Sequence, residues 1–417
     1  MTCSRHRLLV LLFVILVGAC ASLRRPVAPA PTLILISIDG FRADYLERDL
    51  TPALTGLADH GVRAQYMRPS FPSLTFPNHY TLITGLRPDR HGIIANTMHD
   101  EAIPGQRFSA SNREAIENPA WWSGAVPLWT TLRRAGMRSA TMFWPGSEAP
   151  VHGAHPEVWQ RFDANLPAVA RVERVLEWID LPAGERPQLI TLYFNSVDKV
   201  GHHDGPDAPT LDRELERVDA ALAQLLEGLG QRGLRDRVNL VVVSDHGMTA
   251  TSPERVVHLD DVIALQDVRV ASWGVMAGID PLPGKQAAIE ARLLAAHENM
   301  ECRRKSELPA RLHYGNHPRI PAIVCVARHA WIIASREGIA RRSHFSLGEH
   351  GYDIDHPEMR ALFIASGPAF ARGRVIPAFD NVDVYPLLAH VLGVEAEPHD
   401  GNLRNVAASL RSGLPRD

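Results

Sequence analysis

Five short apolar runs recur along the chain, and they show little alternation with polar residues. Taken together, the runs are rich in Ile, Val and Leu, which is typical of strands that are covered on both faces of a sheet. The predicted strands span residues 32–38, 138–144, 188–194, 238–244 and 360–366.

Between these runs lie segments in which apolar residues recur every three or four positions, as on one face of a helix. The clearest are residues 125–136 and 211–230, and a glycine closes each of them. Strand and helix thus alternate along the chain. The sequence therefore predicts an α/β fold with a doubly wound, mainly parallel sheet flanked by helices.

Residues 251–343 break this alternation. Their apolar runs are shorter, and a single helical pattern lies within residues 284–300. We interpret this stretch as a small α+β insertion. Residues 32–250 and 344–417 would then form the core.

The composition is that of an ordinary globular protein and changes the picture little. The chain has 417 residues, 45% of them hydrophobic, which suffices for a substantial core. Lys and Arg total 44 against 47 for Asp and Glu, so the net charge of -3 gives no broad basic field for a nucleic-acid backbone. We therefore expect a small-molecule ligand and no nucleic-acid polymer, and nothing in the sequence indicates a protein partner.

The first 20 residues have the layout of an export signal. A basic start precedes an apolar run from Leu8 to Val17, and small residues follow around Cys20. The letters VGAC also resemble the lipobox of bacterial lipoproteins. We therefore expect an exported, periplasmic lipoprotein that is anchored to the membrane through Cys20, with residues 21–31 as a Pro/Ala tether. Ordinary cleavage after Ala21 is the alternative.

Two cysteines, Cys302 and Cys325, lie beyond the signal region. In an oxidising compartment an even pair favours a disulfide. Two buried thiols remain the alternative, because one sequence does not fix the distance between them.

Acidic residues follow three of the predicted strands. Asp39 comes directly after the first run, Asp198 lies four residues beyond the third, and Asp245 follows the fourth. His202 and His246 accompany the last two. Because ligands of open α/β sheets bind outside the carboxyl ends of the strands, these residues are candidates for one site.

Each of these residues has an ordinary explanation when it is taken alone. An Asp after a strand often caps a helix, and a lone loop His is usually solvated or hydrogen-bonded. Three carboxylates at one sheet edge are different, because converging like charges are costly unless a cation lies among them. The sequence therefore predicts a metal site, to which His350 in the polar loop before the last strand also belongs. We keep the ordinary explanation for His203, His258, His297, His313, His329 and His344.

The ligand types indicate zinc, which binds imidazole nitrogen and carboxylate oxygen in tetrahedral sites. Three Asp and three His are too many for one such ion and enough for two. Two ions about 3.5–4 Å apart can stabilise the attacking and leaving oxygens of a displacement at phosphorus. The set therefore predicts phosphoryl transfer.

The stretch PSFPSLTFPNHY, residues 69–80, places Thr75 where a helical pattern begins. A hydroxyl at that point is usually an N-cap. Beside a metal ion it is also a nucleophile, because the cation acidifies it, and the free N–H groups of the helix start face a phosphate. Pro77 fits in the first turn, where N–H groups have no partner within the helix. We therefore predict that Thr75 is a helix-start residue and also the nucleophile.

Five motifs together resemble the nucleotide pyrophosphatase/phosphodiesterase family of the alkaline phosphatase superfamily, in its bacterial form. They are SIDGFR, PSFPSLTFPNHYTLITGLRPDRHGI, DKVGH, SDHGM and GEHGYD, and the similarity extends from about Leu33 to Leu403. The resemblance implies an alkaline-phosphatase-like fold and two Zn²⁺ ions. It implies that one zinc is bound by Asp198, His202 and His350, and the other by Asp39, Asp245 and His246 with Thr75 beside it.

The resemblance also implies a substrate pocket. Asn96 and the backbone N–H of Thr75 would hold a non-bridging phosphate oxygen. A nucleobase would stack between Phe76 and Tyr193. Trp144 lies in the matching pocket motif FWPGSE, and Phe162 would replace a family tyrosine. An aromatic residue beside a strand end is otherwise most often part of the core.

The implied activity is that of a zinc-dependent phosphodiesterase or nucleotide pyrophosphatase. This hydrolase would release nucleoside 5'-monophosphates through a phosphothreonine at Thr75. A diesterase for choline-headed substrates, such as glycerophosphocholine or lysophospholipids, is the alternative on the same metal site. A sulfatase would need the pattern C/S-x-P-x-R. Here Thr75 stands at the first position and His79 stands where the Arg would be. A surface lipoprotein that only binds a ligand would not need Thr75.

Overall fold

The computed structural model describes residues 32–412. The predicted export signal, Cys20 and the tether at residues 21–31 lie outside these described residues.

A mixed sheet of eight strands runs through the described part of the chain, and its centre is parallel. The first strand, β1, pairs in parallel with β8 on one side and with β9 on the other. Beyond β9 the next strand, β18, runs antiparallel. The predicted α/β class with a mainly parallel sheet is thereby confirmed. Across the sheet the order is β19 (Arg374–Ile376), β2 (Val62–Ala64), β18 (Phe363–Ser366), β9 (Asn239–Val243), β1 (Leu33–Ile38), β8 (Leu189–Phe194), β6 (Ser139–Met142) and β7 (Val158–Trp159).

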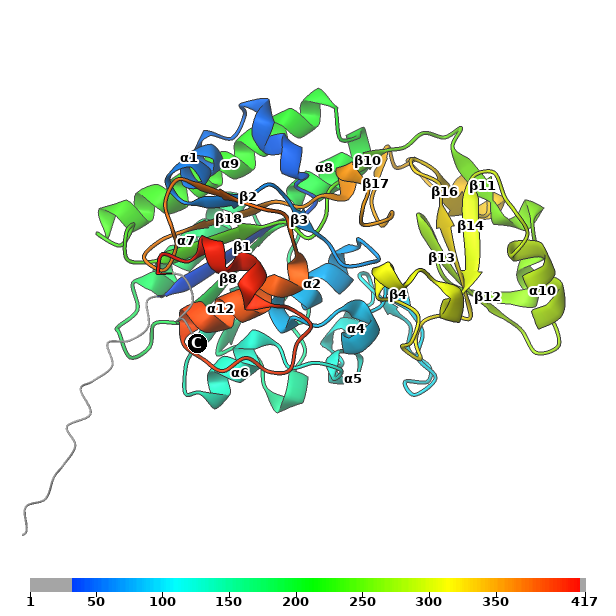
Figure 1. Cartoon of the computed structure of the whole chain (residues 1–417), viewed down its shortest axis with the longest axis horizontal. Helices are drawn as coiled ribbons and strands as arrows, with labels where there is room; N and C mark the ends of the chain where they lie inside the picture. Colours follow the sequence, from blue (N-terminus) through cyan, green and yellow to red (C-terminus); the bar gives the residue numbers. More distant parts are fainter. Residues whose placement is uncertain (1–31, 413–417) are drawn as a thin grey trace, which may run out of the picture. The chain divides into compact units, whose positions relative to one another are not determined.

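Helices cover both faces of this sheet (Figure 1). On one face α1, α7 and α9 pack over the strands, and on the other lie α2, α6 and α12. The helices are α1 (Pro52–His60), α2 (Thr75–Thr84), α3 (Pro88–His91), α4 (Arg113–Glu117), α5 (Pro119–Trp122), α6 (Leu128–Arg134), α7 (Ala168–Ile179), α8 (Ser196–Asp204), α9 (Pro209–Gln231), α10 (Gln286–Leu293), α11 (Arg336–Ala340), α12 (Val384–Leu392) and α13 (Leu403–Val406).

The two-sided cover explains the continuous apolar runs. All six residues of β1 are buried. Leu33 and Leu35 belong to the hydrophobic cluster on one face, while Ile34, Ile36 and Ile38 belong to the cluster on the other. A strand that buries both sets of side chains has no position left for a polar alternation.

The two clearest helical patterns form helices with shifted ends. The pattern at 125–136 becomes α6, which begins only after Pro127, whose backbone is extended. Proline also disfavours the helical conformation in the residue before it, which keeps Val126 outside the helix. The pattern at 211–230 becomes α9, which begins earlier because Pro209 suits a first helical position.

Between residues 251 and 343 the chain builds a second, antiparallel sheet with α10 beside it. Its order is β12 (Val268–Ser272), β13 (Met276–Pro281), β15 (Ile323–Ala327) and β14 (Met300–Arg304). A disulfide joins Cys302 on β14 to Cys325 on β15, so the structure forms the bond that the sequence left open. Shorter pairs complete the fold: β3 (Met67–Arg68) with β20 (Phe379–Asp380), β4 (Thr97–Met98) with β5 (Phe108–Ser109), β10 (Thr249–Ala250) with β17 (Gly348–Glu349), and β11 (Val256–His258) with β16 (Ile332–Ala334).

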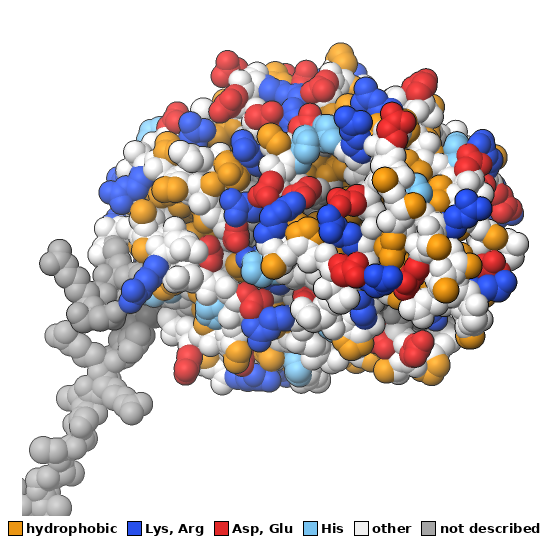
Figure 2. Space-filling view, turned by 45° about the vertical axis from the view of Figure 1, so that its right-hand side comes forward, with side chains coloured by type: hydrophobic (Ala, Val, Ile, Leu, Met, Phe, Trp, Pro, Cys, Tyr) orange, Lys and Arg blue, Asp and Glu red, His pale blue; other side chains and the backbone are white. Residues whose placement is uncertain are grey.

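The surface carries charges of both signs. Figure 2 shows Lys and Arg side chains interspersed with Asp and Glu over the face that it draws. From residue 32 to residue 412, none of the helices combines the length and the apolar character that crossing a membrane requires.

Candidate functional site

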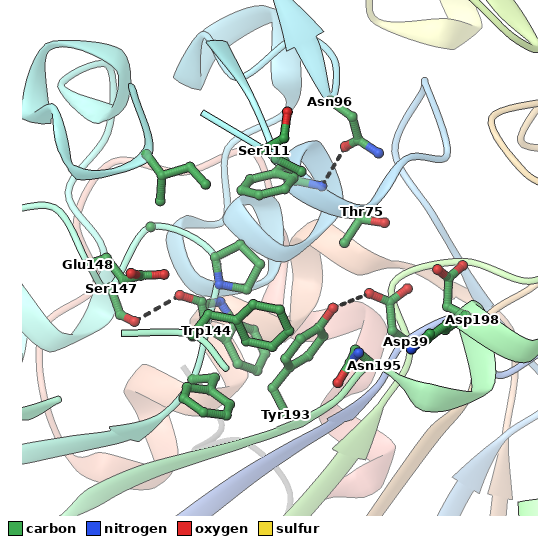
Figure 3. Close-up of a pocket in the computed structure, with 18 of the residues that line it drawn as sticks. Asp39, Thr75, Asn96, Ser111, Trp144, Ser147, Glu148, Tyr193, Asn195 and Asp198 are labelled. Atoms are coloured by element: carbon green, nitrogen blue, oxygen red, sulfur yellow. Dashed lines mark hydrogen bonds between the residues drawn. The ribbon is translucent and has the colours of Figure 1, made fainter. Parts of the chain in front are cut away.

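Three neighbouring strands bring the predicted carboxylates to one edge of the sheet. Asp39 follows β1 directly, and Asp245 lies just beyond the end of β9. Asp198 lies in the first turn of α8, which begins just after β8. Because β8, β1 and β9 are adjacent and parallel, their carboxyl ends meet. Figure 3 shows Asp39 and Asp198 together at one end of a pocket.

The first group of ligands is the buried trio, Asp39, Asp245 and His246, whose ligand atoms lie within 4.8 Å of one another. The Nε2 atom of His246 lies 2.9 Å from Asp245 Oδ2 and 3.5 Å from Asp39 Oδ1. The hydroxyl of Thr75 lies 3.3 Å from the same nitrogen. The trio and Thr75 therefore surround one point at the end of the sheet.

The second group is the cleft-side trio, Asp198, His202 and His350, which meets the same distance criterion. The Nε2 atoms of His202 and His350 lie 3.4 and 3.6 Å from Asp198 Oδ1 and 3.1 Å from each other. The imidazole of His350 also stacks on that of His246, with ring centroids 3.5 Å apart. The two trios thus touch, and the structure brings all six predicted ligands together.

The three histidines share one orientation. In each, Nδ1 contacts a backbone carbonyl oxygen: His202 that of Gly348 at 2.7 Å, His246 that of Gly247 at 2.9 Å, and His350 that of Ser73 at 2.8 Å. A carbonyl only accepts, so Nδ1 carries the proton and donates it. Each Nε2 is then left with a lone pair, which is the arrangement that metal-binding histidines adopt.

Three carboxylate oxygens of the two trios lack hydrogen-bond partners. Asp39 Oδ1, Asp198 Oδ1 and Asp245 Oδ2 are shielded from solvent, and within residues 32–412 they have no hydrogen-bond partner. Buried acceptors of this kind are costly unless a donor or a cation meets them. Because the facing imidazole nitrogens are acceptors as well, the donor set fits bound cations.

Electrostatics point the same way. Burial, together with the negative charges of Asp245 and Asp198, raises the pKa of Asp39 well above its ordinary value. Burial also lowers the pKa of His350 far below its ordinary value, and the neighbouring His246 and His202 add to that shift. The surroundings of Asp39 therefore favour a positive charge beside its carboxylate, while His350 stays neutral, the form that binds a metal.

A glycine sets the spacing of the three carboxylates. Gly40 follows Asp39 with φ +70°, and its N–H donates to Asp245 Oδ1 at 3.2 Å. A Cβ atom built on Gly40 would lie 3.0 Å from both Cα and Cβ of Asp198. The turn after β1 therefore needs glycine both for its backbone conformation and for the close approach of α8.

Thr75 is the first residue of α2, and its position corrects one part of the sequence prediction. The N-cap is Leu74, whose backbone is extended and whose side chain cannot cap. The hydroxyl of Thr75 therefore serves no cap and points instead to His246. The prediction that Thr75 begins a helix is confirmed, and its alternative role as an N-cap is wrong.

Asn96 lies beside the start of the same helix. Its Oδ1 accepts the backbone N–H of Phe76 at 2.9 Å, as Figure 3 shows. This contact orients the side chain so that its amide NH₂ remains available to a ligand at Thr75. The structure thus places Asn96 beside Thr75, where the sequence expected it.

The predicted aromatic residues line a single cavity. Phe76, Trp144, Phe162 and Tyr193 surround a volume of about 500 Å³, which Thr75 also lines. Figure 3 shows Tyr193 and Trp144 between the carboxylates and the far end of the pocket. These side chains are therefore pocket walls, although Trp144 and Tyr193 are also largely buried.

Tyr193 also contacts the carboxylate cluster directly. Its hydroxyl donates to Asp39 Oδ2 at 2.5 Å. Burial, followed by the nearby Asp39 charge, raises the pKa of Tyr193 well above its ordinary value, so the phenol keeps its proton. Tyr193 therefore orients a predicted ligand while its ring forms the pocket wall.

Several polar residues of the pocket were not predicted from the sequence. Glu148, Arg113, Asn195 and Lys199 all line the cavity, and Arg113 Nη1 lies 3.2 Å from Glu148 Oε2. Asn195 follows β8 directly, so the strand-end rule applied to Asp39 would have found it. Arg113 gave no such signal, because its place depends on how distant segments pack.

Arg171 supports the pocket wall that contains Tyr193 and Phe162. It is buried on α7, and its guanidinium donates to the backbone oxygen of Tyr193 at 2.7 Å and to Asn195 Oδ1 at 2.9 Å. The same group lies over the rings of Phe143 and Phe162. Arg171 thereby holds the strand end with Tyr193 and Asn195 in place relative to the rings of Phe143 and Phe162.

Sequence comparisons find relatives over almost the whole chain. A profile of the family "Type I phosphodiesterase / nucleotide pyrophosphatase" matches residues 33–353. An uncharacterised pyrophosphatase/phosphodiesterase of Schizosaccharomyces pombe is 39% identical over 89% of this chain and 78% of its own. Human ectonucleotide pyrophosphatase/phosphodiesterase family member 5 is 35% identical over 92% of this chain and 79% of its own. Rat family member 3 is also 35% identical, but the chain spans only 45% of that longer protein.

Solved structures agree with these matches. Murine ectonucleotide pyrophosphatase / phosphodiesterase 5 superposes with a TM-score of 0.86 at 35% identity, covering 91% of this chain and all of its own. An inactive threonine-to-alanine variant of that murine protein, in complex with AMP, gives the same TM-score and coverage.

Proposed function

The chain belongs to the type I phosphodiesterase / nucleotide pyrophosphatase family of phosphodiester hydrolases, and we propose that it releases nucleoside 5'-monophosphates from nucleotide diesters and phosphoanhydrides. One observation carries this proposal. The hydroxyl of Thr75 lies 3.3 Å from His246 of the buried trio, which the cleft-side trio touches, and Thr75 lines a cavity of about 500 Å³ with aromatic walls. A phosphate at the hydroxyl would have room for its nucleoside in the cavity.

We propose two Zn²⁺ ions as the cofactors. The buried trio would hold one, beside Thr75, and the cleft-side trio would hold the other. Bound zinc supplies Lewis acidity, which lowers the pKa of a nearby hydroxyl or water and neutralises charge that develops on phosphate oxygens. The remaining steps fall to the side chains and backbone of this chain.

Thr75 is the proposed nucleophile. Its Oγ1 gives up its proton and forms a bond to phosphorus, while the ester or anhydride bond breaks and the leaving group departs with the bonding electrons. The result is a phosphothreonine whose phosphorus still carries the nucleoside. Water then cleaves that bond, which releases the nucleoside monophosphate and restores the hydroxyl. The start of α2 favours both steps, because the backbone N–H of Thr75 and the positive end of the helix dipole stabilise an anionic phosphate.

The pocket would position the rest of the substrate. The amide of Asn96 and the backbone N–H of Thr75 would bind a non-bridging phosphate oxygen. Phe76 and Tyr193 offer flat faces for a base, and Trp144 and Phe162 would enclose it. The AMP complex of the murine relative supports a nucleotide in such a pocket. Choline-headed diesters are therefore the weaker alternative.

The test replaces the nucleophile in protein that is loaded with zinc. Thr75→Ala should lower turnover of a nucleotide diester by more than about 10³-fold. Thr75→Ser, the matched control, keeps a hydroxyl and should keep measurable turnover, with a trapped serine that carries the whole nucleoside monophosphate group visible by mass spectrometry. Full turnover by Thr75→Ala with its zinc content unchanged would refute covalent catalysis.

A parallel substrate panel addresses the choice of substrate. A nucleotide diester and a nucleoside triphosphate should be cleaved with a higher kcat/KM than glycerophosphocholine. A marked preference for glycerophosphocholine would reverse the assignment while leaving the metal site unaffected.

We also propose that the protein is exported and anchored through Cys20. The basic start, the apolar run and the letters VGAC support this proposal. Mass spectrometry of the mature N-terminus should find a diacylglyceryl group on Cys20. An unmodified N-terminus after Ala21 would show ordinary secretion instead.

A further inference from the structure

A third group of metal-ligating side chains lies outside the catalytic cleft. His329, His356 and Glu358 each offer one ligand atom, and these atoms lie within 4.8 Å of one another. His329 lies on the connection between β15 and β16, whereas His356 and Glu358 lie on the segment between His350 and β18. We call these three residues the boundary cluster, because they join the region 251–343 to the segment that follows it.

The geometry of the boundary cluster resembles that of the catalytic one. The rings of His329 and His356 stack with centroids 3.5 Å apart and planes 9° apart, and those of His246 and His350 stack with centroids at the same separation. His329 Nε2 lies 3.0 Å from Glu358 Oε2. Two imidazoles and a carboxylate therefore converge without any intervening group.

The ordinary explanation is a hydrogen bond between His329 and Glu358 with His356 stacked on top. That explanation leaves two polar atoms unexplained. The Nδ1 atoms of both His329 and His356 are shielded from solvent and have no hydrogen-bond partner in the described stretch 32–412. Native proteins rarely leave such atoms unsatisfied, so both rings have an unused capacity for a ligand.

We propose that His329, His356 and Glu358 bind a Zn²⁺ ion that is separate from the ions of the catalytic cleft. Two imidazole nitrogens and one carboxylate oxygen form a three-residue zinc set, and water completes the coordination in such sites. Mg²⁺ and Ca²⁺ prefer oxygen ligands and suit this set less well. A cavity of about 340 Å³, which both histidines line, gives room for the water.

A neighbouring residue orients the carboxylate. Thr249 Oγ1 donates to Glu358 Oε2 at 2.9 Å, and Thr249 lies on β10, three residues after His246. Outer contacts of this kind hold a ligating carboxylate in place. The backbone adds a second link, since the N–H of Gly247 donates to the carbonyl oxygen of Met359 at 3.2 Å. The boundary cluster is therefore tied to the strand end that carries the catalytic motif.

The position of the boundary cluster indicates a structural role. An ion there would fix the β15–β16 connection against the segment that leads from His350 to β18. His356 is only six residues beyond His350, a predicted catalytic ligand. The ion would thus stabilise the loop that presents His350 without touching the substrate.

The test compares the zinc content of purified full-length variants. His329→Gln and His356→Gln should each bind one Zn²⁺ fewer per chain than the wild type, as measured by plasma mass spectrometry after equilibration with buffered zinc. The matched control is His297→Gln, because His297 lines the same cavity, lies outside the boundary cluster, and has its Nε2 atom at the backbone oxygens of Arg292 and Leu293. The control should keep the wild-type content. Because the readout is a difference between variants, it holds whatever number of ions the cleft binds.

A second measurement covers the case in which a variant does not fold. Wild-type protein freed of metal and titrated with Co²⁺ should bind a further equivalent after the cleft has filled, and Glu358→Gln should weaken that step at least tenfold. Equal zinc content in the wild type and the two histidine variants would overturn the proposal. Loss of the same equivalent in His297→Gln, or a wild-type titration without the further step, would overturn it as well.

Discussion

The two ligand trios of the cleft differ in exposure although they touch. Asp39, Asp245 and His246 of the buried trio are each at most 1% exposed. In the cleft-side trio the side chain of His202 is 31% exposed and that of Asp198 is 18% exposed. Solvent therefore reaches His202 and Asp198 of the cleft-side trio, whereas His350 is only 4% exposed and the buried trio is almost fully shielded.

The difference follows from the elements that carry the ligands. Both carboxylates of the buried trio stand at strand ends in the middle of the sheet, where helices cover them. The cleft-side trio combines α8 with the segment after β17, so it forms only when the chain returns from residues 251–343. The buried trio is thus positioned mainly by adjacent strands of the sheet, whereas the cleft-side trio depends on long-range assembly and is in part open to solvent.

The largest contrast should come from one ligand of each half. Asp245→Asn should lower kcat/KM by more than about 10³-fold, because the amide brings N–H donors into a dry site and removes a charge that nothing replaces. His202→Gln should cost only about 10–100-fold, because water can take the vacated position. Raising the zinc concentration should rescue His202→Gln and leave Asp245→Asn inactive.

Equal losses in the two variants would break the comparison. Circular dichroism provides the control for folding, since both substitutions keep nearly the volume of the original side chain. A full rescue of Asp245→Asn by zinc would show that solvent reaches the buried trio as well.

The next largest effect is expected from loss of the hydrogen bond that orients Asp39. Tyr193→Phe removes the hydrogen bond to Asp39 Oδ2 and keeps the aromatic wall. Loss of an outer contact of a metal ligand usually costs about 10–100-fold in metal affinity. Zinc affinity, measured by competition with a chelator, should fall accordingly, while KM for a nucleotide diester changes less. A raised KM with unaltered zinc affinity would show that the hydroxyl serves the substrate instead.

A smaller effect is expected on the free energy of unfolding in acid, because a buried histidine packs against α2. His91 is fully buried beneath that helix, 3.1 Å from Thr81 Oγ1, and burial lowers its pKa from 6.5 to about 3. Below pH 6.5 the unfolded chain therefore binds a proton that the folded chain does not, so stability is full above that pH and falls with acid. The loss is at most about 1.4 kcal/mol per pH unit.

Urea unfolding at pH 7 and pH 5 measures this slope. The free energy of unfolding of His91→Asn should fall less between the two pH values than that of the wild type. An equal decrease in the free energy of unfolding of the two proteins would mean that acid destabilises the fold through groups other than His91.

The smallest effect on zinc affinity is expected from the contact between Ser346 and the partly exposed His202. Ser346 Oγ lies 3.2 Å from His202 Nδ1, but the carbonyl oxygen of Gly348 already accepts from that nitrogen at 2.7 Å. Ser346→Ala should therefore cost less than about 1 kcal/mol, which is under tenfold in zinc affinity. A loss as large as that of Tyr193→Phe would remove the distinction between the two halves.

Much of the site was predictable because strand ends are readable in a sequence. Continuous apolar runs indicate covered parallel strands, and the polar residues after them, such as Asp39 and Asp245, must meet at one edge. Their shared charge then indicates a cation. The resemblance to a family supplied Asn96 and the aromatic walls, for which the pattern alone gave no signal.

The remainder depends on contacts between distant segments. The pattern could not decide whether Thr75 caps α2 or begins it, since that depends on the backbone of Leu74. Arg113 and Glu148 meet across the pocket only after the loops have packed. The lone-histidine rule likewise gave His329 an ordinary role, because its partners His356 and Glu358 come from another part of the chain.

The glycine at position 40 has a consequence for protein engineering. Its missing side chain sets the gap between Asp39 and Asp198, so any other residue there would push the two halves of the site apart. The pocket walls that would contact a nucleoside come largely from other segments, such as those of Arg113, Glu148 and Phe162. Mutant libraries aimed at new substrates should therefore vary those walls and keep position 40 constant, because specificity and metal spacing are encoded by separable parts of the chain.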